Sequence, residues 1–235
     1  IRKKIEGLDA SVLSENGLTF TLSGPDDFEP MEIKLSDFKK VSEGVYEYTF
    51  DGRIPTGEYK VVESGEDVEY FTVTVSGSDK AQEVEKDDET VFEIVNEYVA
   101  ENTSYAVVKI WDDAHDKDGK RPDELEVRLL ANGEVIDTVY VSMVDAVIVG
   151  EEDEEYSTGD VWVYVWEELP MADEYAELIS YTAEEVLESD DYEQTDMEGD
   201  EYYTLFVNSH QLEDPCAEGG CGGDIIRPAT PETGR

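Results

Sequence analysis

The stretch YAVVKIWDDAHDKDGKRP, from Tyr105 to Pro122, decides which fold we expect of this chain. It begins with the alternation of a β-strand, in which Val107, Lys109 and Trp111 share one face and the residues between them are apolar as well. A lysine is rarely buried without a partner, because burial disfavours the charged ammonium. Lys109 therefore either extends to solvent from an edge strand or has a buried partner elsewhere in the chain.

The amino-acid composition limits the classes of protein to which this chain can belong. The 235 residues suffice for one large or two ordinary domains, and 39% hydrophobic residues are too many for a disordered chain. A net charge of -44, from 61 acidic and 17 basic residues, argues against nucleic acid and anionic membranes as partners. The sequence has no apolar run long enough to span a membrane and no signal peptide at Ile1, so we expect a mature or excised piece.

Both halves of the chain consist of short alternating segments separated by turn residues, as in a β-sandwich. The strands expected in the first half are 1–5, 18–25, 31–38, 45–50, 57–63, 70–75 and 91–99, with an acidic loop at 79–90. Those expected in the second half are 105–112, a hairpin at 125–141 turning at Asn132-Gly133, and 161–170, 179–185 and 202–210. Helix signals are sparse, so the predicted fold class is all-β.

Four segments, KIWDDAHDKDGKRP (109–122), VWVYVWEELP (161–170), ISYTAEE (179–185) and YYTLFVNSH (202–210), resemble Cna B-type domains of Gram-positive cell-surface proteins and pilins. The segment GVYEYTFDGRIPTGEYKVVE (44–63) is similar to another part of that family, with Ile54 in place of leucine. The resemblance implies two tandem immunoglobulin-like β-sandwiches, a divergent one at 1–100 and a better match at 101–211. Residues 212–235, rich in Gly and Pro, are expected to be a flexible tail.

In this family the lysine two residues before the tryptophan forms an intramolecular isopeptide bond with an asparagine on the last strand. The resemblance implies that Lys109 is the nucleophile, Glu185 the catalytic acid and Asn208 the acceptor. Strand parity agrees, since Ala183 and Glu185 share a face. Glu184 would take the acid's place if the register slipped by one residue.

The corresponding residues in the first domain are Lys3, Glu63 and Asn96. Lys3 shares a face with Ile5, whereas the adjacent Lys4 lies on the polar face. Because Lys3 lies almost at the start of the sequence, two alternatives stay open: a register slip that replaces Lys3 by Lys4, and a bond that does not form.

Isopeptide formation needs a neutral lysine amine, a carboxamide in contact with it, and a carboxylic acid that moves protons while ammonia leaves. Apolar burial favours both the neutral amine and the protonated acid. Fixed proximity on adjacent strands replaces an external enzyme. The reaction is a single autocatalytic turnover that needs no cofactor, so we do not expect an enzyme in the usual sense.

Other candidate sites are weaker. Four aspartates between Asp112 and Asp118 superficially resemble a calcium loop, but their spacing does not fit that motif, and we expect an ordinary turn. His115 and His210 lack partners at metal-ligand spacing, so no metal site is expected. Cys216 and Cys221 would form a small local disulfide if the protein is secreted.

The end of the sequence contains TPETG, which resembles the LPxTG sortase signal with threonine in place of leucine. Its residues are Thr230, Pro231, Glu232, Thr233 and Gly234. The apolar helix and basic tail that normally follow are not in this sequence, so the motif is either a signal separated from its continuation or a chance likeness.

The resemblance implies a structural function: a stalk or pilin-like segment of an extracellular, cell-wall-anchored protein, made rigid by Lys–Asn crosslinks. Its partners would be neighbouring domains or pilin subunits, and the cell wall through sortase. The alternative is an adhesin module that binds a host or matrix ligand through exposed loops such as the acidic insertion at 143–158. No Ser-His-Asp order, metal cluster or cofactor loop in the sequence supports a hydrolase.

Overall fold

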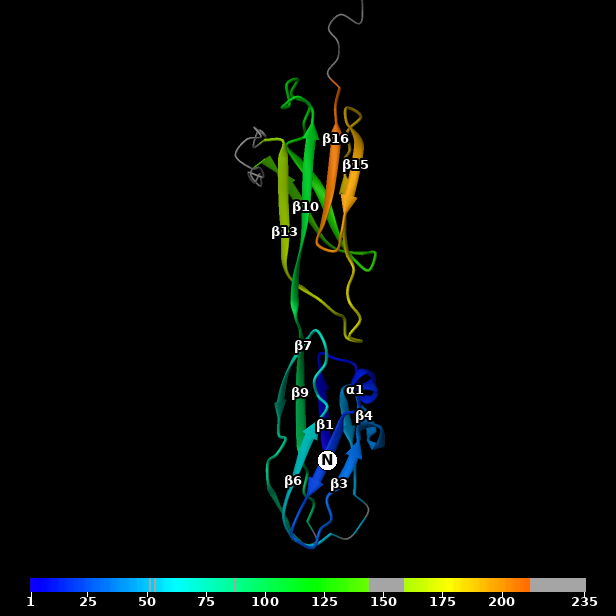
Figure 1. Cartoon of the computed structure of the whole chain (residues 1–235), viewed down its shortest axis with the longest axis vertical. Helices are drawn as coiled ribbons and strands as arrows, with labels where there is room; N and C mark the ends of the chain where they lie inside the picture. Colours follow the sequence, from blue (N-terminus) through cyan, green and yellow to red (C-terminus); the bar gives the residue numbers. More distant parts are fainter. Residues whose placement is uncertain (51, 53, 87, 144–158, 212–235) are drawn as a thin grey trace, which may run out of the picture. The chain divides into compact units, whose positions relative to one another are not determined.

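A computed structural model describes residues 1–50, 52, 54–86, 88–143 and 159–211. Strands dominate these residues, which confirms the predicted all-β class (Figure 1). The strands form four sheets, two built from strands that precede residue 101 and two from strands that follow it. This arrangement gives two tandem β-sandwiches of the immunoglobulin-like kind.

The first sandwich pairs a five-stranded sheet with a four-stranded one. The order of the larger sheet is β4 (Lys39–Ser42), β5 (Val45–Glu47), β1 (Arg2–Glu6), β9 (Glu93–Ala100) and β7 (Phe71–Ser76). The order of the smaller sheet is β3 (Met31–Lys34), β2 (Thr19–Ser23), β6 (Gly57–Ser64) and β8 (Gln82–Val84). Strands β1 and β9 run parallel, with Lys3 opposite Ile94 and Ile5 opposite Asn96.

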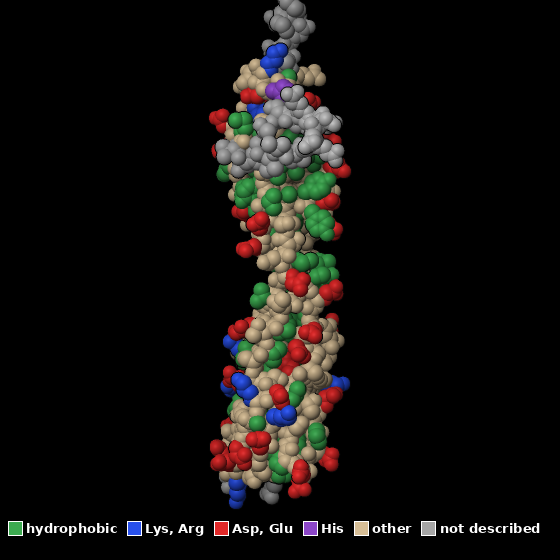
Figure 2. Space-filling view, turned by 60° about the vertical axis from the view of Figure 1, so that its left-hand side comes forward, with side chains coloured by type: hydrophobic (Ala, Val, Ile, Leu, Met, Phe, Trp, Pro, Cys, Tyr) green, Lys and Arg blue, Asp and Glu red, His purple; other side chains and the backbone are tan. Residues whose placement is uncertain are grey.

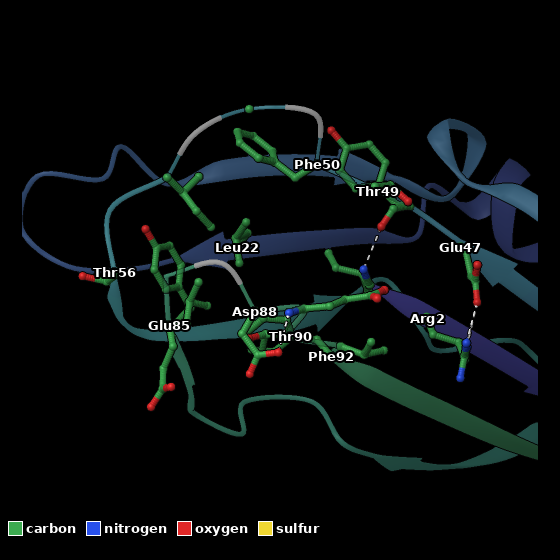
Figure 3. Close-up of a pocket in the computed structure, with 18 of the residues that line it drawn as sticks. Arg2, Leu22, Glu47, Thr49, Phe50, Thr56, Glu85, Asp88, Thr90 and Phe92 are labelled. Atoms are coloured by element: carbon green, nitrogen blue, oxygen red, sulfur yellow. Dashed lines mark hydrogen bonds and ion pairs between the residues drawn. The ribbon is translucent and has the colours of Figure 1, made fainter.

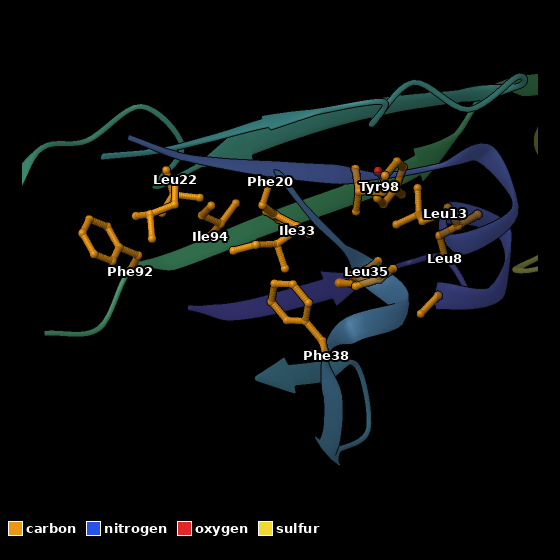
Figure 4. Packing of buried hydrophobic residues seen from close by; sticks show 14 of the residues in the cluster. Leu8, Leu13, Phe20, Leu22, Ile33, Leu35, Phe38, Phe92, Ile94 and Tyr98 are labelled. Atoms are coloured by element: carbon orange, nitrogen blue, oxygen red, sulfur yellow. The ribbon is translucent and has the colours of Figure 1, made fainter. Parts of the chain in front are cut away.

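The core of this sandwich is formed by the inward-facing residues of the alternating strands (Figure 4). Phe20 and Ile94 are completely buried, and the Phe20 and Phe38 rings pack with their centroids 4.8 Å apart. Burying an aliphatic or aromatic side chain of this size contributes about 1.5–3 kcal/mol. The apolar alternation in the sequence therefore fixes which side chains face inward, including the polar ones that share those positions.

Two short helices and two strands, β4 and β8, of this unit were not predicted. Helix α1 (Ala10–Asn16) begins after Asp9, whose carboxylate accepts a hydrogen bond from the Ser11 backbone nitrogen at 2.8 Å, and ends at Gly17, which has a φ of 83°. The 3₁₀ helix η1 (Leu35–Asp37) interrupts the strand predicted at 31–38. Strand β8 lies inside the segment predicted as an acidic loop. Its backbone pairs with β6 and so adds a strand at that edge of the sheet.

The second sandwich also has two sheets. The four-stranded sheet has the order β13 (Val161–Pro170), β10 (Asn102–Asp112), β16 (Tyr203–Ser209) and β15 (Glu193–Gly199). The three-stranded sheet has the order β12 (Glu134–Ser142), β11 (Glu124–Ala131) and β14 (Tyr181–Val186). Asn132 and Gly133 both have positive φ, 51° and 84°, as the predicted type I′ turn between β11 and β12 requires. Strand β15 was missed because all its side chains are exposed and lack apolar alternation.

The described residues separate into two compact units, and the division does not fall at one point of the sequence. One unit consists of residues 1–106, 129–136 and 165–182, and the other of the described parts of 107–128, 137–164 and 183–235. Strand β10 contributes to both units. The domain boundary at residues 100 and 101 therefore stays a prediction.

The loop after β10 is held by a buried ion pair. The Asp113 carboxylate, 1% exposed, accepts hydrogen bonds from Arg121 Nε at 2.9 Å, from Arg121 Nη2 at 2.6 Å and from the Tyr192 hydroxyl at 2.8 Å. Burial alone raises the pKa of this carboxyl, but the hydrogen bonds outweigh it and bring the pKa to about 2. The aspartates of this segment thus contribute to an ion-paired turn.

His210 connects the end of β16 to the same loop. Its backbone nitrogen donates to the Asp112 carbonyl oxygen, Nδ1 lies 2.5 Å from the Asp191 carbonyl oxygen, and Nε2 lies 2.6 Å from Asp118 Oδ2. A carbonyl and a carboxylate only accept hydrogen bonds, so both ring nitrogens donate and the ring is an imidazolium. These bonds, first the one to Asp191 and then the one to Asp118, raise the pKa of His210.

We predict that this imidazolium makes stability depend on pH. Because the pKa of His210 in the folded state exceeds its unfolded value, the stabilisation is complete below the unfolded pKa and is lost as pH rises through the folded pKa. Melting temperatures of the wild type and His210→Gln, measured at a series of pH values from about 6 upward, should differ most at the lowest pH. A difference that stays constant or grows with pH would contradict this assignment.

Candidate functional site

A lysine, a glutamate and an asparagine meet in the core of the first sandwich. Lys3 on β1 and Asn96 on β9 are both 0% exposed, and Glu63 reaches them from β6 of the opposite sheet. Lys3 Nζ donates to Glu63 Oε2 at 2.7 Å, and Asn96 Nδ2 donates to Glu63 Oε1. One carboxylate thus bridges the amine and the carboxamide.

The register of β1 decides which lysine faces inward. Lys3 takes an inward position together with Ile5, whereas the side chain of Lys4 is 45% exposed and forms an ion pair with Glu6 at 2.5 Å. The alternative in which Lys4 replaces Lys3 is therefore not the arrangement that the structure adopts.

Burial changes the acid–base properties of Lys3. Removal of the ammonium from water lowers the pKa of Lys3 to about 8, although the charge and hydrogen bond of Glu63 act in the opposite direction. The Phe20 ring lies beside the amine, with Nζ 5.9 Å from the ring centroid. Because its pKa is lowered to about 8, a larger fraction of Lys3 is uncharged and nucleophilic at neutral pH than of an exposed lysine.

The second sandwich repeats this distribution of residues over its sheets. Lys109 on β10 is 1% exposed, and Asn208 on the adjacent strand β16 is 0% exposed. Glu185 extends from β14 of the other sheet and places Oε2 3.0 Å from Lys109 Nζ, whereas its neighbour Glu184 is exposed. Strand β10 lies between β13 and β16, so Lys109 does not extend to solvent from a sheet edge.

The polar groups of the second site are less well satisfied than those of the first. The Lys109–Glu185 contact lacks hydrogen-bond geometry, and both polar atoms of the Asn208 carboxamide have no hydrogen-bond partner among the described residues. Burial lowers the pKa of Lys109 to about 8, and Nζ lies 4.5 Å from the centroid of the Trp111 ring. Leaving a buried polar group without a partner costs about 1–3 kcal/mol, so native structures rarely keep one without a reason.

Sequence reasoning missed one polar residue of the first site. The Tyr98 hydroxyl lies 3.2 Å from Asn96 Nδ2 and donates to the Glu66 carbonyl oxygen at 2.8 Å. The alternation of β9, in which Ile94, Asn96 and Tyr98 all face inward, was the signal that could have revealed it.

A separate pocket of about 810 Å³ lies in the first sandwich (Figure 3). Phe50, Phe92 and Leu22 form part of its wall, together with polar residues from the segment around Asp88. An ion pair between Arg2 and Glu47 lies at its side, at 2.8 Å. None of Lys3, Glu63 and Asn96 lines this pocket.

Several predicted features lie outside the described residues. They are most of the acidic insertion (144–158), the cysteines Cys216 and Cys221, and the sortase-like motif Thr230–Gly234. Among the residues that are described, no group of three or more His, Cys, Asp or Glu side chains is arranged to hold a metal ion. No helix in the described part of the chain has the length and apolar character needed to cross a membrane.

Several solved structures are distantly similar to this chain. A single B repeat unit of the collagen-binding surface protein of Staphylococcus aureus is 18% identical, with a TM-score of 0.38 over 90% of this chain and 98% of that one. The major pilin T3.2 of Streptococcus pyogenes is 15% identical, with a TM-score of 0.29 over 89% of this chain and 95% of that one.

Sequence comparison is more specific. Over 92 residues the chain is 36% identical to the collagen adhesin of Staphylococcus aureus, a match that spans 39% of this chain and 6% of the adhesin. Residues 105–207 match the family model of the Cna protein B-type domain. The matched range begins at the first residue of the stretch Tyr105–Pro122 and includes Lys109 and Glu185. The resemblance to Cna B-type domains is therefore confirmed over residues 105–207, which match the model of that family.

Proposed function

We propose that this chain is a structural segment of a Gram-positive cell-surface protein, a stalk or pilin-like piece, in which each sandwich forms an intramolecular Lys–Asn isopeptide bond. The observation that carries the proposal is the buried Lys3–Glu63–Asn96 cluster, in which one carboxylate contacts both the amine and the carboxamide. Lys109, Glu185 and Asn208 would act in the same way in the second sandwich.

The proposed reaction balances without any co-reactant. The Lys3 ammonium gives a proton to Glu63, and the neutral Nζ attacks Asn96 Cγ and forms the new C–N bond. Glu63 transfers that proton to Nδ2, the bond between Cγ and Nδ2 breaks, and ammonia leaves. Glu63 then takes the second proton from Nζ, so that the products are a neutral amide, ammonia and a protonated Glu63. The two strands hold the reacting groups together, so the effective concentration is high without an enzyme.

The bond would supply a covalent tie that these sandwiches otherwise lack. The sequence contains no cysteine before Cys216, so a disulfide cannot tie either sandwich internally. By the entropy model used for disulfides, closing a loop of roughly 100 residues stabilises the fold by about 4–5 kcal/mol. A segment that transmits force between a cell and its surroundings would gain resistance to unfolding and proteolysis.

The cell-surface role is supported by the family of the second sandwich and by the similarity to a collagen adhesin. On the face shown in Figure 2, acidic side chains are spread over the surface, with fewer Lys and Arg side chains between them. Such a charge distribution repels copies of the protein from one another. We propose that residues 1–100 and 101–211 are successive rigid modules of the segment.

The first prediction concerns mass. If both bonds form, the intact protein should weigh less than its sequence by two molecules of ammonia, because each bond releases one. Mass spectrometry of the purified chain measures this directly. A deficit of one ammonia would limit the proposal to one sandwich, which peptide mapping would identify, and a full sequence mass would reject it.

The second prediction concerns Glu185. Glu185→Ala should leave the fold intact but slow the second bond by roughly two to four orders of magnitude, since the proton carrier is lost. The variant should regain one ammonia of mass, melt at a lower temperature and be cleaved faster by protease.

Glu184→Ala is the matched control, because Glu184 is the exposed neighbour on the same strand. It should retain the bond and the melting temperature of the wild type. Loss of the bond in Glu184→Ala but not in Glu185→Ala would show that the acid is misassigned.

The third prediction concerns pH. Each lysine–glutamate pair is reactive when it holds one proton, because transfer within the pair then yields a neutral amine and a protonated acid together. Above the lysine pKa of about 8 the pair loses this proton and the acid is gone. The rate of ammonia loss, followed by mass spectrometry while chain purified under denaturing conditions and still unreacted folds for the first time, should therefore fall above pH of about 8. A rate that keeps rising with pH would mean that only amine deprotonation matters.

A further inference from the structure

We propose that the Tyr98 hydroxyl positions the leaving nitrogen of Asn96 and thereby speeds crosslinking in the first sandwich. The inference rests on the proposed function, since it assigns a role within the same reaction. Tyr98 would form no covalent bond; it would act through its contact with Nδ2.

The hydrogen bonds around Asn96 determine how its carboxamide is turned. The Tyr98 hydroxyl has one proton, which it donates to the Glu66 carbonyl oxygen at 2.8 Å. Its oxygen must therefore accept from Asn96 Nδ2, 3.2 Å away. The two protons of Nδ2 are then both used, one on Tyr98 and the other on Glu63 Oε1. Asn96 Oδ1 has no partner among the described residues.

The opposite orientation of the carboxamide is unfavourable. A flipped Asn96 would turn Oδ1 toward the Glu63 carboxylate and the Tyr98 oxygen, both of which face it with lone pairs. Tyr98 therefore adds to the preference for the orientation in which Nδ2 touches Glu63. This is the orientation that the reaction needs, because Glu63 takes the lysine proton and must deliver a proton to the nitrogen that leaves.

The acid–base properties of Tyr98 suit this role. Burial, the largest effect, raises the pKa of Tyr98 to about 12, so the phenol stays protonated at physiological pH. Its proton thus remains on the Glu66 carbonyl oxygen, and its oxygen remains an acceptor for Nδ2. The residue is only 5% exposed, so water does not readily replace it at this contact.

Among the described residues of the second sandwich, no tyrosine hydroxyl contacts the asparagine in this way. The residue two positions after Asn208 is His210, whose ring nitrogens face Asp191 and Asp118 instead. Asn208 Nδ2 has no hydrogen-bond partner among the residues that the structure describes. Removal of the Tyr98 hydroxyl should therefore affect the first bond alone, and the second bond of the same molecule provides an internal reference.

The experiment compares the wild type, Tyr98→Phe and Tyr59→Phe as full chains. Tyr59 is a matched control, because it is 1% exposed in the same core and its hydroxyl also donates to a backbone carbonyl, that of Pro55, at 3.0 Å. Each chain is synthesised and purified under denaturing conditions, so that it has not folded or reacted, and its full sequence mass is checked first. It is then folded by dilution, folding is followed by circular dichroism, and peptide mapping gives the ammonia loss at each site over time.

Tyr98→Phe should slow the first bond by roughly 2- to 10-fold relative to Tyr59→Phe, the effect of losing one hydrogen bond in the reacting state. The folding rate and the second bond should be the same in the two variants. Lys3→Ala versions of both variants, which cannot crosslink at this site, should have similar melting temperatures, so that a general loss of stability does not explain the slower reaction.

The outcomes separate this inference from the proposed function. If the wild type forms the first bond and Tyr98→Phe forms it as fast as Tyr59→Phe, the role of Tyr98 is rejected and the proposed function stands. If folding slows in parallel with the first bond, Tyr98 acts on the fold and the inference is also rejected. If the wild type never loses ammonia from Asn96, the proposed function of the first sandwich fails, and the inference fails with it.

Discussion

The structure depends on the burial of a lysine amine against a glutamate from the opposite sheet, an interaction that both sandwiches contain. A buried ion pair is weak evidence for stability, because the cost of removing two charges from water often exceeds their attraction. Hydrophobic residues of the same volume would fill the positions of Lys3 and Lys109 at lower cost. The proposed crosslinking would explain why two costly lysines occupy the core, because that reaction requires a buried amine beside a carboxyl group.

The two sites share a plan but differ in how well they hold the carboxamide. In both, the lysine and the asparagine lie on neighbouring strands of one sheet and the glutamate comes from the other sheet. In the first site Asn96 is bound by Glu63 and Tyr98, whereas Asn208 has no such partners among the described residues. The first site, which resembles the family less closely in sequence, thus holds its carboxamide by more hydrogen bonds than the second site does. The two bonds would therefore form with different hydrogen-bond partners around the asparagine.

Strand parity predicted much of the fold and placed Lys3, Lys109 and Glu185 inward, because apolar alternation is a direct record of which face is buried. Elements whose sequences lack this apolar alternation were not predicted. The short helix α1 depends on a cap at Asp9 rather than on a long periodic face, and strand β15 is exposed on both faces. The Tyr98 contact was missed because an aromatic residue on an inward face looks like core, and its hydroxyl partners are distant in sequence.

The central claim is that these buried pairs are reactants, and a crystal structure at high resolution tests it most directly. The account predicts continuous electron density between Lys3 Nζ and Asn96 Cγ, at the length of an amide C–N bond of about 1.33 Å, with no density for Nδ2. The same result is expected between Lys109 and Asn208. Density for an intact carboxamide and a separate lysine amine at non-bonded distance, in protein that folded at neutral pH, would contradict it.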